Sequence, residues 1–208
     1  MEQNHNLTAW EKMQLDMIYD DFDEDLFNRR VDAKNIFNRF NQTTDEQVEE
    51  RNELLKQLFG SIGENVYVEP TFKCEFGKNI YIGNDVYINF GAVLLDCSRI
   101  TIGNNVLMAS HIFISDNSHG CYKGSENDSD PTIPPTQREY TTAPISIGDN
   151  TWIGEGVIIM PGVTIGMGCV IGAHSVVSKS IPDYCVAVGS PAKPIKKYDF
   201  KTKKWIKI

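Results

Sequence analysis

The histidines are the first candidates for chemistry in this sequence, because the pKa of imidazole lies near neutral pH. Four are present: His5, His111, His119 and His174. His111 and His174 fill a turn position of a six-residue repeat, which gives both a structural explanation. His119 stands where the repeat stops, among small polar residues that can form hydrogen bonds. We therefore expect His119 to act as a general base; an exposed loop histidine is the alternative.

A zinc site is the competing interpretation of the same residues. His111, His119 and His174 would supply three imidazoles, a ligand set that zinc enzymes use. However, His111 and His119 are eight residues apart, and two of the three histidines fill turn positions. The glycines recur at fixed places in the repeat, so they do not indicate a phosphate-binding loop, and no Gly-x-Ser-x-Gly nucleophile motif occurs. We expect no metal requirement.

The elements that must position His119 are built from the six-residue repeat. Successive hexapeptides over residues 147–176 begin with Ile, usually continue with Gly, and carry Asn, Gly or His in fourth place. The same phase is found upstream, between residues 62 and 113. A helix does not tolerate so many glycines, and a plain strand does not turn this often. The repeat predicts an all-β fold, a parallel β-helix of triangular coils in which Ile147 lies over Ile165.

The first part of the chain, residues 1–60, has helical periodicity. A capping box at Thr8 and Glu11 predicts a first helix, and apolar stripes predict two more, over residues 23–40 and from residue 44 to Gly60. These helices are expected to cap the open end of the β-helix, which would otherwise expose apolar surface.

The remainder divides into a β-helix and a tail. Residues 61–192 are expected to form the β-helix, interrupted by a loop insertion at residues 116–144 where the six-residue phase is lost. Loops of this length are uncommon unless they are functional or disordered. Residues 193–208 form a basic C-terminal tail with a single acid, Asp199. This tail suits either an anionic small ligand or plain solvent exposure.

The composition excludes some function classes. The formal net charge of −8 argues against a nucleic-acid partner. No long apolar stretch and no signal-peptide core is found, so we expect no membrane span and a cytoplasmic protein. The cysteines are scattered without a C-x-x-C pair, which agrees with reduced thiols in that compartment.

Several motifs resemble a known family. The stretches at residues 150–154 (NTWIG) and 161–166 (PGVTIG) resemble the maltose and galactoside O-acetyltransferases among the hexapeptide-repeat acyltransferases. Residues 115–120 (SDNSHG) and 189–193 (GSPAK) more closely resemble polysaccharide O-acetyltransferases of O-antigen and capsule clusters. The resemblance implies a left-handed β-helix and a homotrimer with active sites between subunits. It also implies transfer of acetyl from acetyl-CoA to a saccharide hydroxyl.

The resemblance further implies roles for single residues. His119 matches the catalytic base, which removes the hydroxyl proton while the oxygen attacks the thioester directly. Glu139 matches a carboxylate that orients the imidazole and stabilises its charged form. Trp152 matches an indole beside the thioester, and Glu155 matches the position whose backbone N–H stabilises the oxyanion.

The implied coenzyme site includes five further residues. Ala173, Ser178 and Lys179 match the wall of the groove for pantetheine and nucleotide. Lys193 and Lys196 match basic residues near the CoA phosphates, where many relatives have Arg. Lysine keeps the charge but lacks the bidentate geometry of guanidinium.

The implied acceptor site is formed by Asp21, Asn89 and Asp96, each of which also has an ordinary structural explanation. Glu75 and Cys97 stand where the galactoside enzymes have other polar groups, which predicts a different acceptor sugar. Two alternatives stay open. One is an N-acetyltransferase of an amino sugar or sugar nucleotide, and the other is a non-catalytic trimeric β-helix that serves as a scaffold.

Overall fold

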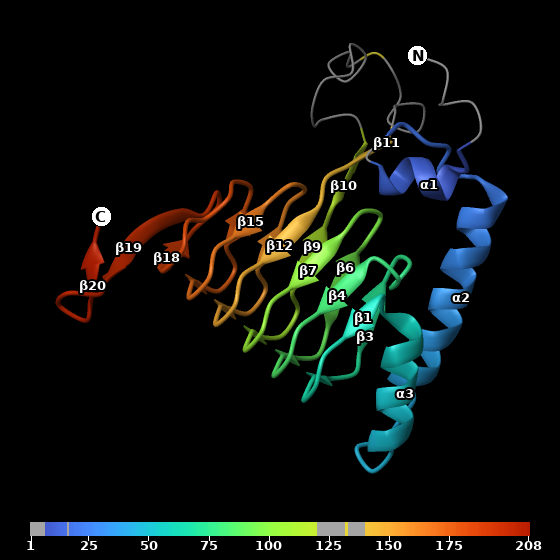
Figure 1. Ribbon diagram of the computed structural model, residues 1–208, viewed down its shortest axis with the longest axis horizontal. Helices are drawn as coiled ribbons and strands as arrows, with labels where there is room; N and C mark the ends of the chain where they lie inside the picture. The colour runs from blue at the N-terminus through green and yellow to red at the C-terminus, as the bar shows by residue number, and fades with distance from the viewer. Residues whose placement is uncertain (1–6, 16, 120–131, 133–139) are drawn as a thin grey trace.

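The computed structural model describes residues 7–15, 17–119, 132 and 140–208, and only the backbone of residues 119, 140 and 141. Its main body is a stack of triangular coils, with helices packed at the N-terminal end and a β-hairpin at the C-terminal end (Figure 1). The fold is a left-handed parallel β-helix, as the repeat and the resemblance predict.

Three parallel sheets form the faces of this prism, and each successive coil adds one strand to each sheet. The first face contains β1 (Ser61–Ile62), β4 (Ile80–Ile82), β7 (Ile100–Ile102), β12 (Ile145–Ile147) and β15 (Thr164–Ile165). The second face contains β2 (Tyr67–Val68), β5 (Tyr87–Ile88), β8 (Leu107–Met108), β13 (Trp152–Ile153), β16 (Val170–Ile171) and β18 (Cys185–Val188). The third face contains β3 (Phe72–Cys74), β6 (Ala92–Leu95), β9 (Phe113–Ser115), β14 (Ile158–Ile159) and β17 (Val176–Val177).

The strand register confirms the predicted coil. Ile147 of β12 pairs with Ile165 of β15, so the two isoleucines lie one above the other. Both point inward, with exposed fractions of 2% and 0%. Burial of one such side chain stabilises a fold by about 1.5–3 kcal/mol relative to leaving it in water. The column of leading isoleucines therefore contributes to the stability of the prism through its place in the buried core.

The corners explain the histidines of the repeat. His111 and His174 have positive φ angles of 58° and 55°, as has Asn150 at 58°. Each ring lies against a glycine of the preceding coil. A Cβ atom on Gly91 would stand 2.8 Å from the His111 ring, and one on Gly156 would stand 2.5 Å from the His174 ring. Both histidines therefore have the structural role at the corners that the repeat predicts.

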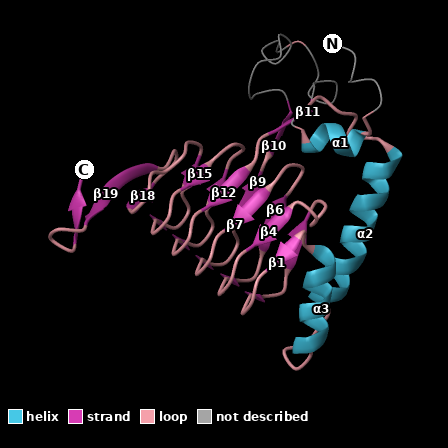
Figure 2. Ribbon diagram, in the orientation of Figure 1, coloured by secondary structure: helices cyan, strands magenta, loops and turns pink. Residues whose placement is uncertain are grey.

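Three helices close the N-terminal end of the prism (Figure 2). They are α1 (Ala9–Gln14), α2 (Glu24–Asn41) and α3 (Val48–Leu58). The predicted capping box is present, because Glu11 N donates to Thr8 Oγ1 over 3.2 Å and Thr8 N donates to Glu11 Oε2 over 2.8 Å. Phe40 and Leu58 are buried in the same cluster as the isoleucines of the coils. The helices thus extend the core of the β-helix, as a cap is expected to do.

The basic C-terminal segment, residues 193–208, contains two strands that its sequence pattern does not predict. Strands β19 (Lys193–Asp199) and β20 (Lys204–Lys207) extend the second face as an antiparallel hairpin. The aromatic rings of Tyr198 and Trp205 lie 5.3 Å apart across the hairpin. The lysines dominate the composition of this segment, and they conceal the alternation that would have predicted strands.

The insertion leaves the prism between the third and the first face. Its two ends pair as antiparallel strands, β10 (Asn117–His119) and β11 (Tyr140–Thr142) (Figure 1). Among the helices that the structure describes, none combines the length and the apolar character needed to cross a bilayer.

Candidate functional site

The predicted base lies on the strand pair at the root of the insertion. The backbone of His119 is paired with that of Tyr140, so His119 lies across the ladder from the residue that follows Glu139. The side chain of His119 and the whole of Glu139 lie outside the described residues. The topology nevertheless brings the two ends of a long insertion together.

A buried carboxyl group fixes the root of this strand pair. Asp116 is 0% exposed, and its side chain accepts hydrogen bonds from Cys97 N over 2.9 Å and Ser98 N over 2.7 Å. Its backbone oxygen accepts from Ala143 N over 2.8 Å. Burial, with the Asp96 carboxyl nearby, raises the pKa of the Asp116 carboxyl well above its usual value. Asp116 therefore ties both strands of the insertion to the prism.

Asp96, an implied acceptor residue, is also fully buried. Its Oδ1 atom accepts from Glu75 N over 3.0 Å and Phe76 N over 2.9 Å, and its Oδ2 atom accepts from Asn79 N over 3.2 Å. Burial raises the pKa of Asp96 to about 7, although the backbone N–H donors act in the opposite direction. In this chain Asp96 holds the turn after β3, and through it the side chain of Glu75.

A cavity of about 610 Å³ opens beside this turn. Its volume falls within the range of about 300–1,000 Å³ that small-molecule pockets occupy. The described residues that line it come from α2, the segment before α2 and the turn after β3: Asp21, Phe22, Glu24, Phe27, Arg30 and Glu75. One of the implied acceptor residues, Asp21, thus lines a pocket of suitable size.

Arg30 organises this pocket. Its Nε atom donates to Glu75 Oε1 over 2.5 Å, its Nη1 atom donates to the backbone oxygen of Asp21 over 2.8 Å, and its Nη2 atom donates to the Asp21 carboxylate. Burial alone would lower the pKa of the guanidinium, but Asp21 and Glu75 outweigh it and the net shift is upward. Sequence reasoning missed Arg30, because its partner Glu75 is distant in the chain and no local motif marks the pair.

A small second core joins the pocket to the root of the insertion. Tyr19, Phe76 and Cys97 belong to one buried cluster with residues of α1 and α2. Asn117 of β10 donates to the Cys97 sulfur over 3.1 Å. Burial raises the pKa of the Cys97 thiol, and the carboxylates of Asp116 and Glu75 add to the shift. The pocket and the strand that carries His119 therefore share one packed support.

The predicted site residues lie along two edges of the prism. The loop edge joins the third face to the first, and it carries Asp96, the insertion, Ser178 and Lys179. The histidine edge joins the second face to the third, and it carries Asn89, Glu155 and Ala173 together with His111 and His174. Trp152, whose side chain is 50% exposed, lies on β13 just before the histidine edge. Within one chain, the two groups of residues face different directions.

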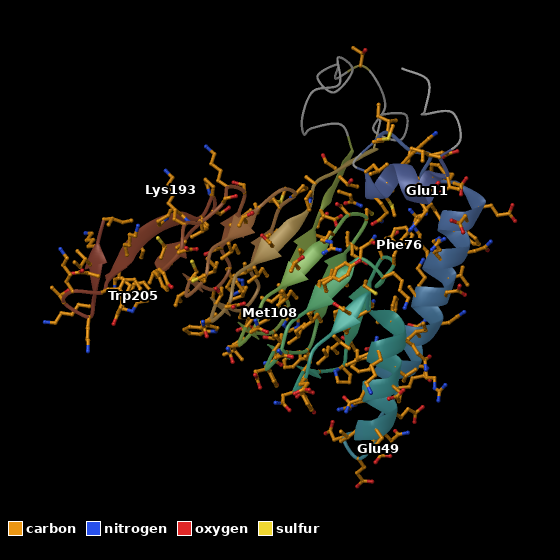
Figure 3. All side chains as sticks on the ribbon, in the orientation of Figure 1. Glu11, Glu49, Phe76, Met108, Lys193 and Trp205 are labelled. Atoms are coloured by element: carbon orange, nitrogen blue, oxygen red, sulfur yellow. The ribbon has the colours of Figure 1, made fainter. Side chains whose placement is uncertain are left out.

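All but one of the coenzyme candidates are exposed. Glu155, Ala173 and Lys179 lie at corners open to solvent, and Ser178 is half-buried. Lys193 and Lys196 are exposed on β19, at the opposite end of the stack from Phe76 and Glu49 (Figure 3). Within the described part of the chain, no group of three or more His, Cys, Asp or Glu side chains is arranged to hold a metal ion.

Comparison with known proteins places this geometry in a family. Residues 12–63 match the model of the maltose acetyltransferase hexapeptide capping motif, and residues 144–179 match that of the bacterial transferase hexapeptide (six repeats). The galactoside O-acetyltransferase of Escherichia coli is 36% identical over 198 residues, which cover 95% of this chain and 93% of the relative.

Comparison with solved structures leads to the same family. A maltose O-acetyltransferase from Clostridium difficile superposes with a TM-score of 0.86 at 39% identity, covering 93% of this chain and 98% of the other. A galactoside acetyltransferase in complex with coenzyme A superposes with a TM-score of 0.83 at 35% identity, covering 95% and 94% of the two chains. The chain belongs to the hexapeptide-repeat acetyltransferases, in the group of the galactoside and maltose O-acetyltransferases.

Proposed function

We propose that this protein transfers the acetyl group of acetyl-CoA to a hydroxyl group of a saccharide, with His119 as the general base. The observation that carries the proposal is the position of the pocket. A cavity of sugar-binding size lies on the loop edge and shares its packed support with β10, the strand that carries His119. The similarity to saccharide acetyltransferases over nearly the whole chain supports the same reaction.

In the proposed reaction, His119 takes the proton of the acceptor hydroxyl while its oxygen attacks the thioester carbonyl. The tetrahedral oxyanion is stabilised by the backbone N–H of Glu155. When the C–S bond breaks, the imidazolium returns the proton to the departing CoA thiolate, so that the products are an acetyl ester and CoA. Glu139 orients the imidazole and stabilises its charged form.

The separation of the site residues over two edges supports a homotrimer. One chain holds its insertion and acceptor pocket on the loop edge and holds Asn89, Glu155 and Ala173 on the histidine edge. A symmetric ring in which the loop edge of each chain faces the histidine edge of the next would complete three sites. Trp152 would then lie beside the thioester in the cleft between subunits.

The coenzyme and acceptor contacts follow from the same arrangement. Ala173, Ser178 and Lys179 would line the pantetheine and nucleotide groove. The exposed ammonium groups of Lys193 and Lys196 would neutralise the CoA phosphates.

On the acceptor side, Asp21 lines the pocket and would accept hydrogen bonds from sugar hydroxyls, and Asn89 would reach the acceptor from the neighbouring chain. Asp96 would contribute by positioning Glu75.

The test is acetyl transfer by the purified protein to a panel of saccharides, followed by release of the CoA thiol and by product mass. We expect transfer to at least one neutral saccharide, with an acetyl group that mild alkali removes, because esters hydrolyse readily and amides do not. An alkali-stable product would instead support the N-acetyltransferase. Absence of CoA binding in calorimetry would support the non-catalytic scaffold.

A further inference from the structure

The charges that line the pocket do not balance. Its described lining residues include three carboxylates, from Asp21, Glu24 and Glu75, and one guanidinium, from Arg30. A pocket built to take an anionic acceptor would present cations with free donors. This pocket presents an excess of negative charge.

The single cation of the described lining is already engaged. Each of the three guanidinium nitrogens of Arg30 donates to Asp21 or to Glu75. The plane of the guanidinium also lies over Phe76, with the carbon 5.0 Å from the ring centroid. An incoming carboxylate, sulfate or phosphate would have to break one of these bonds to reach Arg30, and it would face the Glu24 carboxylate at the same time.

Two exposed aromatic rings complete the lining. Phe22 is 77% exposed and Phe27 is 60% exposed. Large apolar side chains in a pocket provide area for an apolar group or for the apolar face of a pyranose ring. The face of an aromatic ring also attracts a cation that carries apolar substituents, and nearby carboxylates strengthen that attraction.

We propose that this pocket selects the acceptor by charge, with a cationic saccharide preferred over a neutral one and a neutral one over an anionic one. Glu75 determines the selection, because it both adds negative charge and occupies Arg30. This inference rests on the proposed function, since it assigns the pocket to the acceptor. It names the class of saccharide that the enzyme takes, one with an apolar face or an apolar substituent that is positively charged or uncharged.

The size of the effect follows from Coulomb's law. A unit charge about 7 Å from one carboxylate in a largely aqueous pocket changes an equilibrium about three- to fivefold. Two unbalanced carboxylates therefore give about tenfold in kcat/KM for each step of the series from cationic to neutral to anionic. The differences should shrink when the salt concentration is raised, because exposed charges are screened.

The experiment compares three glycosides that share one sugar and differ at the far end of an alkyl aglycone. One ends in a methyl group, one in a trimethylammonium group and one in a carboxylate. The quaternary ammonium group cannot be acetylated. A difference in kcat/KM between the acceptors therefore comes from its charge and not from a second acceptor group. For the wild-type enzyme we expect the ratio of kcat/KM between the trimethylammonium and the carboxylate acceptor to be about a hundredfold at low salt.

Three variants separate the effect of Glu75 on this ratio from the effect of the net charge of the protein. Glu75→Gln should reduce that ratio at least tenfold, because it removes one charge and releases the Nε donor of Arg30. Glu24→Gln removes one charge without touching Arg30 and should reduce the ratio less. Glu49→Gln, on α3 at the far end of the cap (Figure 3), makes the same change in net charge and should leave the ratio unchanged.

The outcomes are distinguishable. Equal kcat/KM for the three acceptors, or a preference for the carboxylate, would overturn the charge selection while leaving the acetyltransferase function intact. An unchanged ratio in Glu75→Gln would overturn the role of Glu75. Acetyl transfer to none of the acceptors would overturn the proposed function and this inference with it.

Discussion

Replacement of Arg30 by Met is the most informative test of how the cap is held to the prism. The side chain of Arg30 is 13% exposed, and its partners Asp21 and Glu75 are 22% and 27% exposed. Removal of one partner of a buried ion pair costs about 3–5 kcal/mol, since the remaining charges stay buried and unpaired. Because water partly reaches these carboxylates, we expect Arg30→Met to lower the free energy of unfolding by about 2–4 kcal/mol.

The assay is urea unfolding of the wild type, Arg30→Met, Glu75→Gln and the double variant. The double-mutant cycle should give a coupling energy of about 1–2 kcal/mol between Arg30 and Glu75. Lys56→Met is the matched control, because the Lys56–Glu53 pair is 62% and 64% exposed and should be worth under about 0.5 kcal/mol. A loss in Arg30→Met no larger than in this control, or a coupling energy near zero, would refute the reasoning.

Two further predictions concern the prism itself. Burial raises the pKa of Asp96 from 3.8 to about 7, so between these values the native protein holds a proton that the unfolded chain has released. The contribution of Asp96 to the free energy of unfolding should therefore fall by about 1.4 kcal/mol per pH unit as pH rises across this window. Urea unfolding at several pH values should show a steeper fall in the wild type than in Asp96→Asn, where the raised pKa of Asp116 still contributes a fall of the same sign; the same slope in both would contradict the prediction. Gly156→Ala should lower stability by about 2–3 kcal/mol, because Gly156 has a φ of 64° and the new Cβ would stand 2.5 Å from the His174 ring. The companion change His174→Gly should recover part of that loss in thermal melts, and full additivity of the two variants would count against the contact.

The fold was predictable because the repeat is a local pattern with a long-range consequence. A glycine or asparagine at each corner and an isoleucine at each inward position are enough to define the coil, and Ile147 over Ile165 follows from them. The capping box at Thr8 was predictable for the same reason, because its partners are three residues apart.

The features that sequence reasoning missed depend on distant partners or on composition. Arg30 meets Glu75 only once α2 lies against the first coil, so neither residue signals the pair by itself. Asp96 has the appearance of a surface acid in the sequence, yet the folded chain buries it under backbone donors. The hairpin of β19 and β20 was hidden by its lysines.

The most direct test of the central claim is the rate of acetyl transfer by His119→Asn. Loss of a general base typically costs about a hundredfold to ten-thousandfold in rate. We expect a loss of that size in kcat, with CoA binding and the oligomeric state unchanged, whereas His111→Asn should stay within a few-fold of the wild type because Asn tolerates its φ of 58°. Transfer by a folded His119→Asn variant at the wild-type rate would contradict the assignment of His119 as the base.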